Sequence, residues 1–486
     1  MKNQLINDVI EKRIIRLTTR IILIIGALRR ITAGASRVVP FASMLAAIGV
    51  GILLVGLSDS RLDDPRVVWL FYFPLLLACT LSGRRHPALG SPLHHMATVL
   101  ACLALVAGLG LRAKDAKAQN ASMRTQLISV GPEREIKTLA EASRLARSGA
   151  VIEVDAGEYV GDVAVWNQDA LTVRAVGGRV KLVAAGEAAE GKAIWVMRGG
   201  QMSVDGFDFS GARVPDRNGA GIRLEKGKLQ IRNCRFMENE NGILTGNQPD
   251  TELEIENSEF GYNGYGDGQS HNLYAGAIAR LSVTGSYFHH ANVGHLLKSR
   301  AAVNRIFYNR LSDESGGRAS YELEFAIGGI AYVVGNIIQQ SSQTENPHLI
   351  SYGAEGYKWP RNGIYLVNNT FVNDRSPGGV FLRVGPGDVT IRAVNNLLVG
   401  KGRLETAGSG EYRNNYNVSH DDIDPAGDYR LKARSTLRGG TVVPQPVDGI
   451  NLQPDAEYTY PTGTRAIIGK TDLPGALQAN PANQRR

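Results

Sequence analysis

From about residue 200 to residue 400 the chain repeats one short pattern of apolar and polar positions. A few apolar residues lead into a polar corner rich in Gly and Asn, and Phe, Leu or another apolar residue follows. The copies are VDGFDF at 204, IRNCRF at 231, IENSEF at 255, VTGSYF at 283, IFYNRL at 306, VVGNII at 333, VNNTFV at 367 and VNNLLV at 394. Starts 23 to 34 residues apart, with short apolar segments, predict a solenoid whose coils bury their apolar faces by stacking.

The composition favours a β-solenoid over helical repeats. A leucine-rich repeat would need regular Leu and a helix in each unit, and the copies have neither. The chain has 56 glycines among 486 residues and only 7% aromatics, which is typical of turn-rich β structure. We therefore expect an all-β solenoid domain over residues 131–420, followed by an extended tail or cap over 421–486.

A short helix is expected ahead of the solenoid. Thr138 and Glu141 are spaced as a capping box, which opens the amphipathic segment LAEASRLARS and predicts a helix ending at Gly149. The polar stretch 112–130 before it is interpreted as a linker.

The N-terminal part has a different pattern. Residues 38–57 are uncharged and long enough to cross a bilayer, and 67–82 and 93–111 are further apolar runs, so 38–111 is expected to hold about three transmembrane spans. The preceding residues 1–37 are strongly basic. By the positive-inside rule they remain in the cytoplasm and the part after about residue 112 is exported.

This pattern indicates a bacterial-type inner membrane with the solenoid on the periplasmic or extracytoplasmic side. An alternative is a signal peptide from Met96 with a cleavage site at Ala116-Lys117-Ala118, which would release the domain. The net charge of +8 is concentrated near the N-terminus, and the exported part mixes both signs. Nucleic-acid binding is therefore not expected.

An earlier strand in each coil carries the candidate chemistry. With apolar residues placed inward, alternation along these strands predicts two outward columns. The first is Trp195, Arg223, Leu244, Tyr274, Lys298 and Glu322. The second is Met197, Glu225, Gly246, Gly276, Arg300 and Glu324. Two bases would then lie one strand spacing from two acids.

Such a row suits chemistry on an acidic sugar polymer. Abstraction of the C5 proton of a uronic acid needs a cation or metal at its carboxylate, a base at C5 and an acid for the leaving oxygen. Arg300 can hold a carboxylate, and Lys298 can be the base if the neighbouring Arg lowers its pKa, although opposing carboxylates would raise it. Glu322 and Glu324 could instead bind calcium.

Further candidates surround this row. Asn272 and Tyr274 are expected beside Lys298, and the Gly-rich loop GYGDGQSHNLY brings Asp267 and His271 to its edge. Asp267 or Asn272 could complete a calcium site. The earlier pair, Arg223 with Glu225, could extend a substrate groove or simply form an ion pair.

The histidines outside that loop are expected to be structural. His295 falls at an inward position beside Leu297, so we expect it to be buried and hydrogen-bonded. His289 and His290 are expected at a solvated turn.

Over about residues 130 to 420 the chain resembles the right-handed parallel β-helix, or pectate-lyase-like, superfamily. The entry helix ahead of GAVIEVDAGEYVGDVAV looks like its N-terminal cap. With Lys, Arg and Glu-x-Glu on one face, the chain resembles chondroitinase B and related alginate lyases. In that family Lys is the base while Asn and two Glu hold calcium. Here Lys298 and Arg300 precede Glu322 and Glu324 by one coil, and Asn272 lies two coils before these acids.

Mannuronan C5-epimerases share this fold and use a His and a Tyr, for which His271 and Tyr274 are the counterparts. The leading hypothesis is therefore a membrane-anchored, exported lyase or C5-epimerase acting on an acidic polysaccharide. A glycoside hydrolase using Glu322, Glu324 or Asp267 is one alternative. A non-catalytic glycan-binding or envelope scaffold protein, with the charged row as an ion-pair ladder, is another.

Overall fold

The computed structural model describes residues 125–344, 346–404, 410–424, 428–432 and 435–478. The expected basic segment 1–37, the transmembrane region 38–111 and most of the linker lie outside these residues. Within the described ranges, no helix has both the length and the apolar character needed to cross a membrane.

The solenoid begins with a strand and a short helix. Strand β1 (Leu127–Val130) pairs with β2 (Ala150–Val160), so the linker expected to reach residue 130 ends earlier. Helix α5 (Leu139–Leu145) starts where the sequence predicts, with the Thr138 hydroxyl accepting from the backbone N–H of Glu141 at 3.1 Å. It ends before Gly149, because Ala146 already has an extended backbone conformation.

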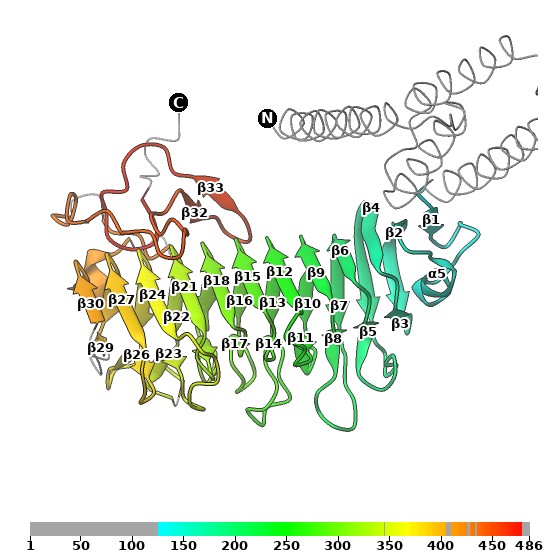
Figure 1. Ribbon diagram of the computed structural model, residues 1–486, viewed down its shortest axis with the longest axis horizontal. Helices are drawn as coiled ribbons and strands as arrows, with labels where there is room; N and C mark the ends of the chain where they lie inside the picture. The colour runs from blue at the N-terminus through cyan, green and yellow to red at the C-terminus, as the bar shows by residue number, and fades with distance from the viewer. Residues whose placement is uncertain (1–124, 345, 405–409, 425–427, 433–434, 479–486) are drawn as a thin grey trace, which may run out of the picture. The chain divides into compact units, whose positions relative to one another are not determined.

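Each full coil contributes one strand to a 10-stranded parallel sheet and two to a 21-stranded parallel sheet. The short sheet contains β3 (Ala164–Trp166), β5 (Ala193–Met197), β8 (Ala220–Leu224), β11 (Asn241–Thr245), β14 (Leu273–Ala275), β17 (Leu297–Ser299), β20 (Leu323–Phe325), β23 (His348–Tyr352), β26 (Gly379–Val384) and β29 (Gly402–Leu404). In Figure 1 successive coils follow one another along this part of the chain.

The long sheet starts with β1, β2 and β4 (Ala170–Val183) and continues in two columns. The first column contains β6 (Gln201–Asp205), β9 (Lys228–Arg232), β12 (Glu252–Glu256), β15 (Arg280–Thr284), β18 (Val303–Phe307), β21 (Ile330–Val334), β24 (Gly363–Val367), β27 (Thr390–Val394) and β30 (Gly410–Arg413). The second contains β7 (Phe207–Ser210), β10 (Arg235–Met237), β13 (Glu259–Gly261), β16 (Tyr287–His289), β19 (Arg310–Ser312), β22 (Ile337–Gln340), β25 (Thr370–Asn373), β28 (Leu397–Gly400) and β31 (Tyr416–Val418). The all-β expectation is thus confirmed, as a right-handed-type parallel β-solenoid.

Stacking of equivalent side chains fills the core. The rings of Phe209, Phe236, Phe260 and Phe288 lie one above the next, with centroids 4.9, 4.7 and 4.6 Å apart. All four are fully buried. The Phe that closes several repeat copies is therefore a core residue, and each coil covers the ring of the previous one.

The Asn of the repeat forms a buried ladder at the corner between the two columns. Asn309 donates through its backbone N–H to the side-chain oxygen of Asn336 at 2.8 Å, and Asn336 donates in the same way to Asn369 at 3.0 Å. Asn396 and Asn415 continue the ladder. Because each amide also donates to a backbone carbonyl, the polar corner is satisfied without water.

The C-terminal segment crosses the outer face of the long sheet. Its strands β32 (Ala456–Tyr458) and β33 (Thr464–Ala466) form an antiparallel pair, red in Figure 1. A 3₁₀ turn (His420–Asp422) precedes them. Tyr308 donates through its hydroxyl to Asp455 at 2.8 Å, which ties this segment to the coils.

Candidate functional site

The outer face of the short sheet carries a continuous column of side chains. Parallel register pairs Leu244 with Tyr274, Tyr274 with Lys298, and Lys298 with Glu324. The full column is Val196, Arg223, Leu244, Tyr274, Lys298, Glu324, Ser351 and Arg383. Tyr274 and Lys298 are thus neighbours, as the sequence predicts, and Glu324 completes a row of three chemical groups.

The expected register of Glu322 is wrong. Its side chain is fully buried, and neither carboxyl oxygen has a hydrogen-bond partner among the described residues. The reason is that β20 covers only Leu323–Phe325, so alternation between faces does not extend back to Glu322. Trp195 is also fully buried, and Val196 takes its expected place in the column.

Burial gives Glu322 an unusual state. The apolar surroundings, and then the nearby Asp313, raise the pKa of Glu322 well above the ordinary value of a glutamate. Burial likewise raises the pKa of Asp313 to about 6. Glu322 therefore keeps its proton to higher pH than an ordinary glutamate.

Lys298 lies between two carboxylates. Its Nζ is 3.0 Å from Oε2 of Glu324 and 3.2 Å from Oε1 of Glu355. Burial favours the neutral amine, but the attraction of these two carboxylates is greater in sum and raises the pKa of Lys298. The expectation that a neighbouring Arg would lower this pKa is wrong, and Lys298 is an ammonium at neutral pH.

Arg300 follows strand β17 and binds the same carboxylate. Its Nη2 donates to both oxygens of Glu355, at 2.7 and 2.6 Å. Its Nη1 donates to the hydroxyl of Tyr274, and its guanidinium lies 5.2 Å from the centroid of that ring. Arg300 therefore connects the phenol oxygen of Tyr274 to a bound carboxylate.

Two stacked imidazoles lie beside this row. The rings of His271 and His295 are 4.4 Å apart, and the ring of His271 also meets Tyr274 edge-on at 5.2 Å. The Nδ1 of His271 accepts the backbone N–H of His295 at 2.9 Å. Burial, reinforced by His295 and Lys298, lowers the pKa of His271 well below its ordinary value. A neutral ring with Nδ1 as acceptor carries its proton on Nε2, so His271 is a hydrogen-bond donor there.

His295 is buried, as expected, but it belongs to the charged row. Its Nε2 lies 3.1 Å from Oε2 of Glu324, while Tyr321 covers its ring edge-on at 5.0 Å. Burial lowers the pKa of His295 although Glu324 opposes the shift. Burial alone would raise the pKa of Glu324, but its contacts with His295 and Lys298 prevail and lower it. Glu324 is accordingly a carboxylate in close electrostatic contact with both neighbours.

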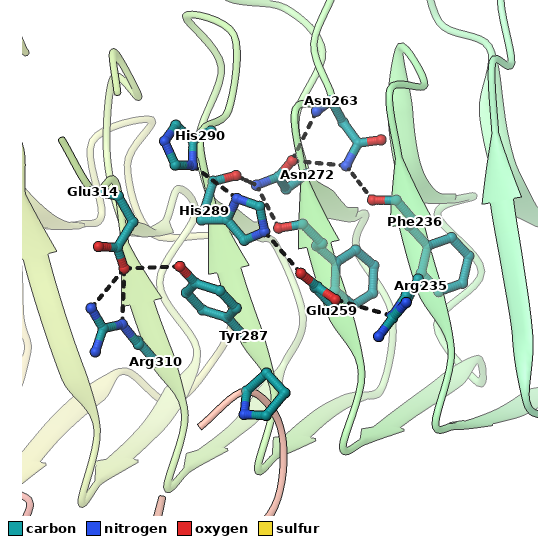
Figure 2. A network of polar contacts seen from close by, with 12 residues as sticks. Arg235, Phe236, Glu259, Asn263, Asn272, Tyr287, His289, His290, Arg310 and Glu314 are labelled. Atoms are coloured by element: carbon teal, nitrogen blue, oxygen red, sulfur yellow. Dashed lines mark hydrogen bonds and ion pairs between the residues drawn. The ribbon is translucent and has the colours of Figure 1, made fainter. Parts of the chain in front are cut away.

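Asn272 does not face this surface. It is fully buried, and its side-chain oxygen accepts from Nδ2 of Asn263 at 2.8 Å. Its own Nδ2 donates to the carbonyl of His289 at 2.8 Å (Figure 2). The expected role of Asn272 in substrate or calcium binding is wrong, because these structural contacts occupy its amide.

The surroundings of the other histidine pair differ from the expected solvated turn. His289 is buried, with Nε2 3.3 Å from Glu259, and its Nδ1 is 2.9 Å from Nδ1 of His290 (Figure 2). Both belong to a polar network on the outer face of the second column of the long sheet. They do not join the row on the short sheet.

The expected calcium ligands do not come together. Glu322 is inside the solenoid, Glu324 is on its outer face, and Asp267 uses its carboxylate to accept the backbone N–H of Gln269 at 3.0 Å in an exposed turn. Nowhere in the described part of the chain are three His, Cys, Asp or Glu side chains arranged to hold a metal. These residues do not fit a calcium site, and no step proposed below uses the ion.

Arg223 and Glu225 contact each other, with Nε of the arginine 3.4 Å from Oε1 of the glutamate. Lys192 is the second partner of Glu225, at 3.0 Å. Arg223 stands in the outward column two coils before Tyr274. This pair can therefore flank a ligand that runs along the column, and its own charges are already compensated.

No sequence pattern indicates Glu355 as a member of the site. It lies 57 residues after Lys298, on the loop that follows β23, so no alternation or repeat spacing relates the two. Arg383 was also missed, although it extends the column and donates to the hydroxyl of Tyr321 at 3.2 Å. His295 lies just before Lys298 in the sequence, but this spacing indicates a shared site only when the correct strand register is known.

Among known proteins, the chain has distant similarity to several solved structures. No protein-family model matches the chain, and no curated protein matches it. Among solved structures, a pectate lyase, Pel9A, is 13% identical with a TM-score of 0.44, over 68% of this chain and 95% of that one. The ORF18 protein of Geobacillus virus E2 is 14% identical with a TM-score of 0.41, over 64% and 63%. A pectin methylesterase from Aspergillus niger is 11% identical with a TM-score of 0.24, over 64% and 90%.

Proposed function

We propose that the protein is an enzyme that abstracts the C5 proton of a uronic acid within an acidic polysaccharide, as a lyase or a C5-epimerase. One observation carries this proposal. Lys298 and Arg300 together hold the carboxylate of Glu355 on the outer face of the short sheet. Arg300 also donates to the phenol oxygen of Tyr274. A carboxylate and a proton-transfer group are thus side by side.

The chemistry follows from that pairing. Neutralising the uronate carboxylate with two cations stabilises the negative charge that develops on it when the C5 proton leaves. A tyrosine accepts a proton as the phenolate and donates it as the phenol, and Arg300 contacts the Tyr274 oxygen, so Tyr274 is our candidate for the group that takes the proton from C5. In a lyase, elimination then breaks the bond to the oxygen at C4, which receives a proton. In an epimerase, C5 takes a new proton from water on the opposite face, and Tyr274 returns the proton that it removed to the solvent.

The remaining groups fit supporting roles. The Nε2–H of neutral His271 can donate to a sugar hydroxyl or to the leaving oxygen. Glu324 forms an ion pair with Lys298 and lies 3.1 Å from Nε2 of His295, so it can keep both in position beneath the substrate. In this scheme Lys298 binds and stabilises charge, because its raised pKa makes it a poor base.

The test is a product analysis of the purified protein on a panel of acidic glycans that includes pectate, alginate and chondroitin. A lyase would create an unsaturated sugar that absorbs in the ultraviolet. An epimerase would change the ratio of C5 epimers and incorporate deuterium from heavy water at C5. Absence of both changes on every uronate polymer would contradict the proposal, and binding without turnover would favour a glycan-binding role.

A glycoside hydrolase is the second candidate, because Glu324 and Glu355 both contact Lys298 and so form a close pair of carboxyl groups. A hydrolase needs one of such a pair protonated. The pKa of Glu355, however, is lowered, since Arg300 and Lys298 outweigh its burial. The pKa of Glu324 is lowered too. New reducing ends without ultraviolet absorbance would nevertheless decide for hydrolysis.

We also propose that the apolar runs in 38–111 anchor the protein in the membrane, with the solenoid on the extracytoplasmic side. The support is the charge pattern of the sequence. Fractionation of cells, with protease added to intact spheroplasts, tests it. A mature protein that begins near residue 119 and is recovered from the medium would support signal cleavage instead.

A further inference from the structure

Glu355 comes from outside the column yet reaches its centre. It lies on the loop after β23, and its backbone N–H donates to the carbonyl of Ala326 at 2.8 Å. On the same loop, the indole N–H of Trp359 donates to the carbonyl of Arg300 at 3.0 Å. These two hydrogen bonds hold the backbone of the loop beside the site. The loop thereby places the carboxylate of Glu355 against Lys298 and Arg300.

The two carboxylates beside Lys298 differ in access. The side chain of Glu324 is 5% exposed, whereas that of Glu355 is 40% exposed. Glu324 is fixed below the ammonium by His295 as well. Glu355 lies on the solvent side, and rotation of its side chain alone would release Lys298 and Arg300 without moving the anchored loop.

We infer that Glu355 is a resident carboxylate that occupies the place of the substrate's uronate group and must be displaced when the glycan binds. This inference rests on the proposed function, and it identifies Glu355 as a residue that determines which sugars bind. A ligand that brings its own carboxylate can replace both contacts of Glu355. A neutral or esterified sugar cannot, and it is excluded.

The charge count explains this selectivity. Lys298 and Arg300 are compensated by Glu324 and Glu355 in the free protein. When a uronate takes the position of Glu355, two cations again face two carboxylates. When a neutral ligand pushes Glu355 aside, one partly buried cation loses its partner, which is costly in a site of reduced dielectric constant.

The experiment compares the full-length protein with its Glu355→Gln variant by calorimetric titration. The probes are trimers of galacturonate, glucuronate and mannuronate, together with their methyl esters. We expect the variant to bind the preferred acidic trimer with a Kd about tenfold lower, because a competing charge-assisted contact is gone. The methyl esters, which bring no carboxylate to the two cations, should still bind the variant at least about tenfold more weakly than the acidic trimer. Glu256→Gln removes a carboxylate paired with Arg232 on the long sheet and is the matched control, expected to leave Kd unchanged.

Each other result overturns the inference. Unchanged or weaker binding by Glu355→Gln would mean that Glu355 positions the cations. Methyl esters that bind the variant as tightly as the acidic trimer would mean that Glu355 only blocks space. If no acidic trimer binds either protein, the two cations are not a uronate site. The proposed reaction is judged separately. Trimers that bind more tightly to the variant but are never turned over would contradict the proposed enzymatic function and would still support displacement of Glu355.

Discussion

Lys298 and Glu324 are cross-strand neighbours, with their Cα positions paired between β17 and β20 and the ammonium 3.0 Å from the carboxylate. Together with Glu355, this neighbour keeps the pKa of Lys298 above its ordinary value. The lysine therefore stays cationic through and beyond neutral pH. In the proposed reaction, Lys298 therefore acts through its positive charge and not as a base.

Replacing Lys298 by Met keeps the length of the side chain and removes that charge. We expect kcat/KM on the preferred uronate polymer to fall on the order of 10³-fold, since a group that stabilises developing charge is lost. Lys228→Met, which removes a lysine paired with Glu252 on the long sheet, is the control and should retain activity. Steady-state kinetics measure both. Full activity in Lys298→Met would show that the reaction takes place elsewhere.

Replacing Tyr274 by Phe separates proton transfer from binding. The ring and its contacts with the two cations remain, while the hydroxyl that accepts from Arg300 is removed. We expect kcat to fall roughly 10²-fold or more, with little change in the Kd of an acidic trimer. Single-turnover kinetics and titration give the two quantities. A parallel loss of both would make Tyr274 a binding residue.

The buried acid Glu322 predicts a specific dependence of stability on pH. Its pKa is raised in the folded protein, so its contribution to stability is complete below the pKa of the unfolded chain and is lost as the pH rises toward the folded value. The Glu322→Gln variant remains neutral at every pH. We expect it to match the wild-type protein near pH 4 and to exceed its free energy of unfolding at pH 8.

Denaturant unfolding across this pH range measures the difference between the two proteins. Glu256→Gln, which changes a half-buried carboxylate paired with Arg232, is the comparison. A difference between Glu322→Gln and wild type that does not grow with pH would show that Glu322 has an ionised partner within the solenoid.

The Asn ladder predicts a large cost for one amide. In Asn336→Ala, the carbonyl of Ile306 and the backbone N–H of Asn309 lose partners at 2.7 and 2.8 Å inside the protein. We expect a loss on the order of 3 kcal/mol in the free energy of unfolding. The exposed Asn167→Ala should change it little. Chemical denaturation of both variants provides the test, and similar values would mean that the ladder contributes nothing beyond ordinary surface amides.

The solenoid could be predicted from the sequence because the apolar residues and the corner asparagines act within each coil and against the next. The pairing of Tyr274 with Lys298 could be predicted for the same reason, since both lie inside regular strands. Glu322 could not be placed, because it precedes a strand of only three residues and turns inward.

Two other features of the site depend on contacts that sequence alternation does not encode. Asn272 belongs to a buried amide network whose partners come from a neighbouring corner. Glu355 reaches Lys298 from a loop with no fixed relation to the repeat. The candidate site is thus predictable where it is built from strand faces and unpredictable where loops and corners complete it.

In the ladder from Asn309 to Asn415, every corner offers the same side-chain oxygen to a backbone N–H of the coil before it. The coils of this part can therefore stack on one another in the same way. Duplication or deletion of one whole coil would therefore leave every amide matched, whereas a fragment of a coil would not. Gain or loss of one whole coil would thus lengthen or shorten the outer face of the short sheet by one strand spacing and leave the charged row unchanged.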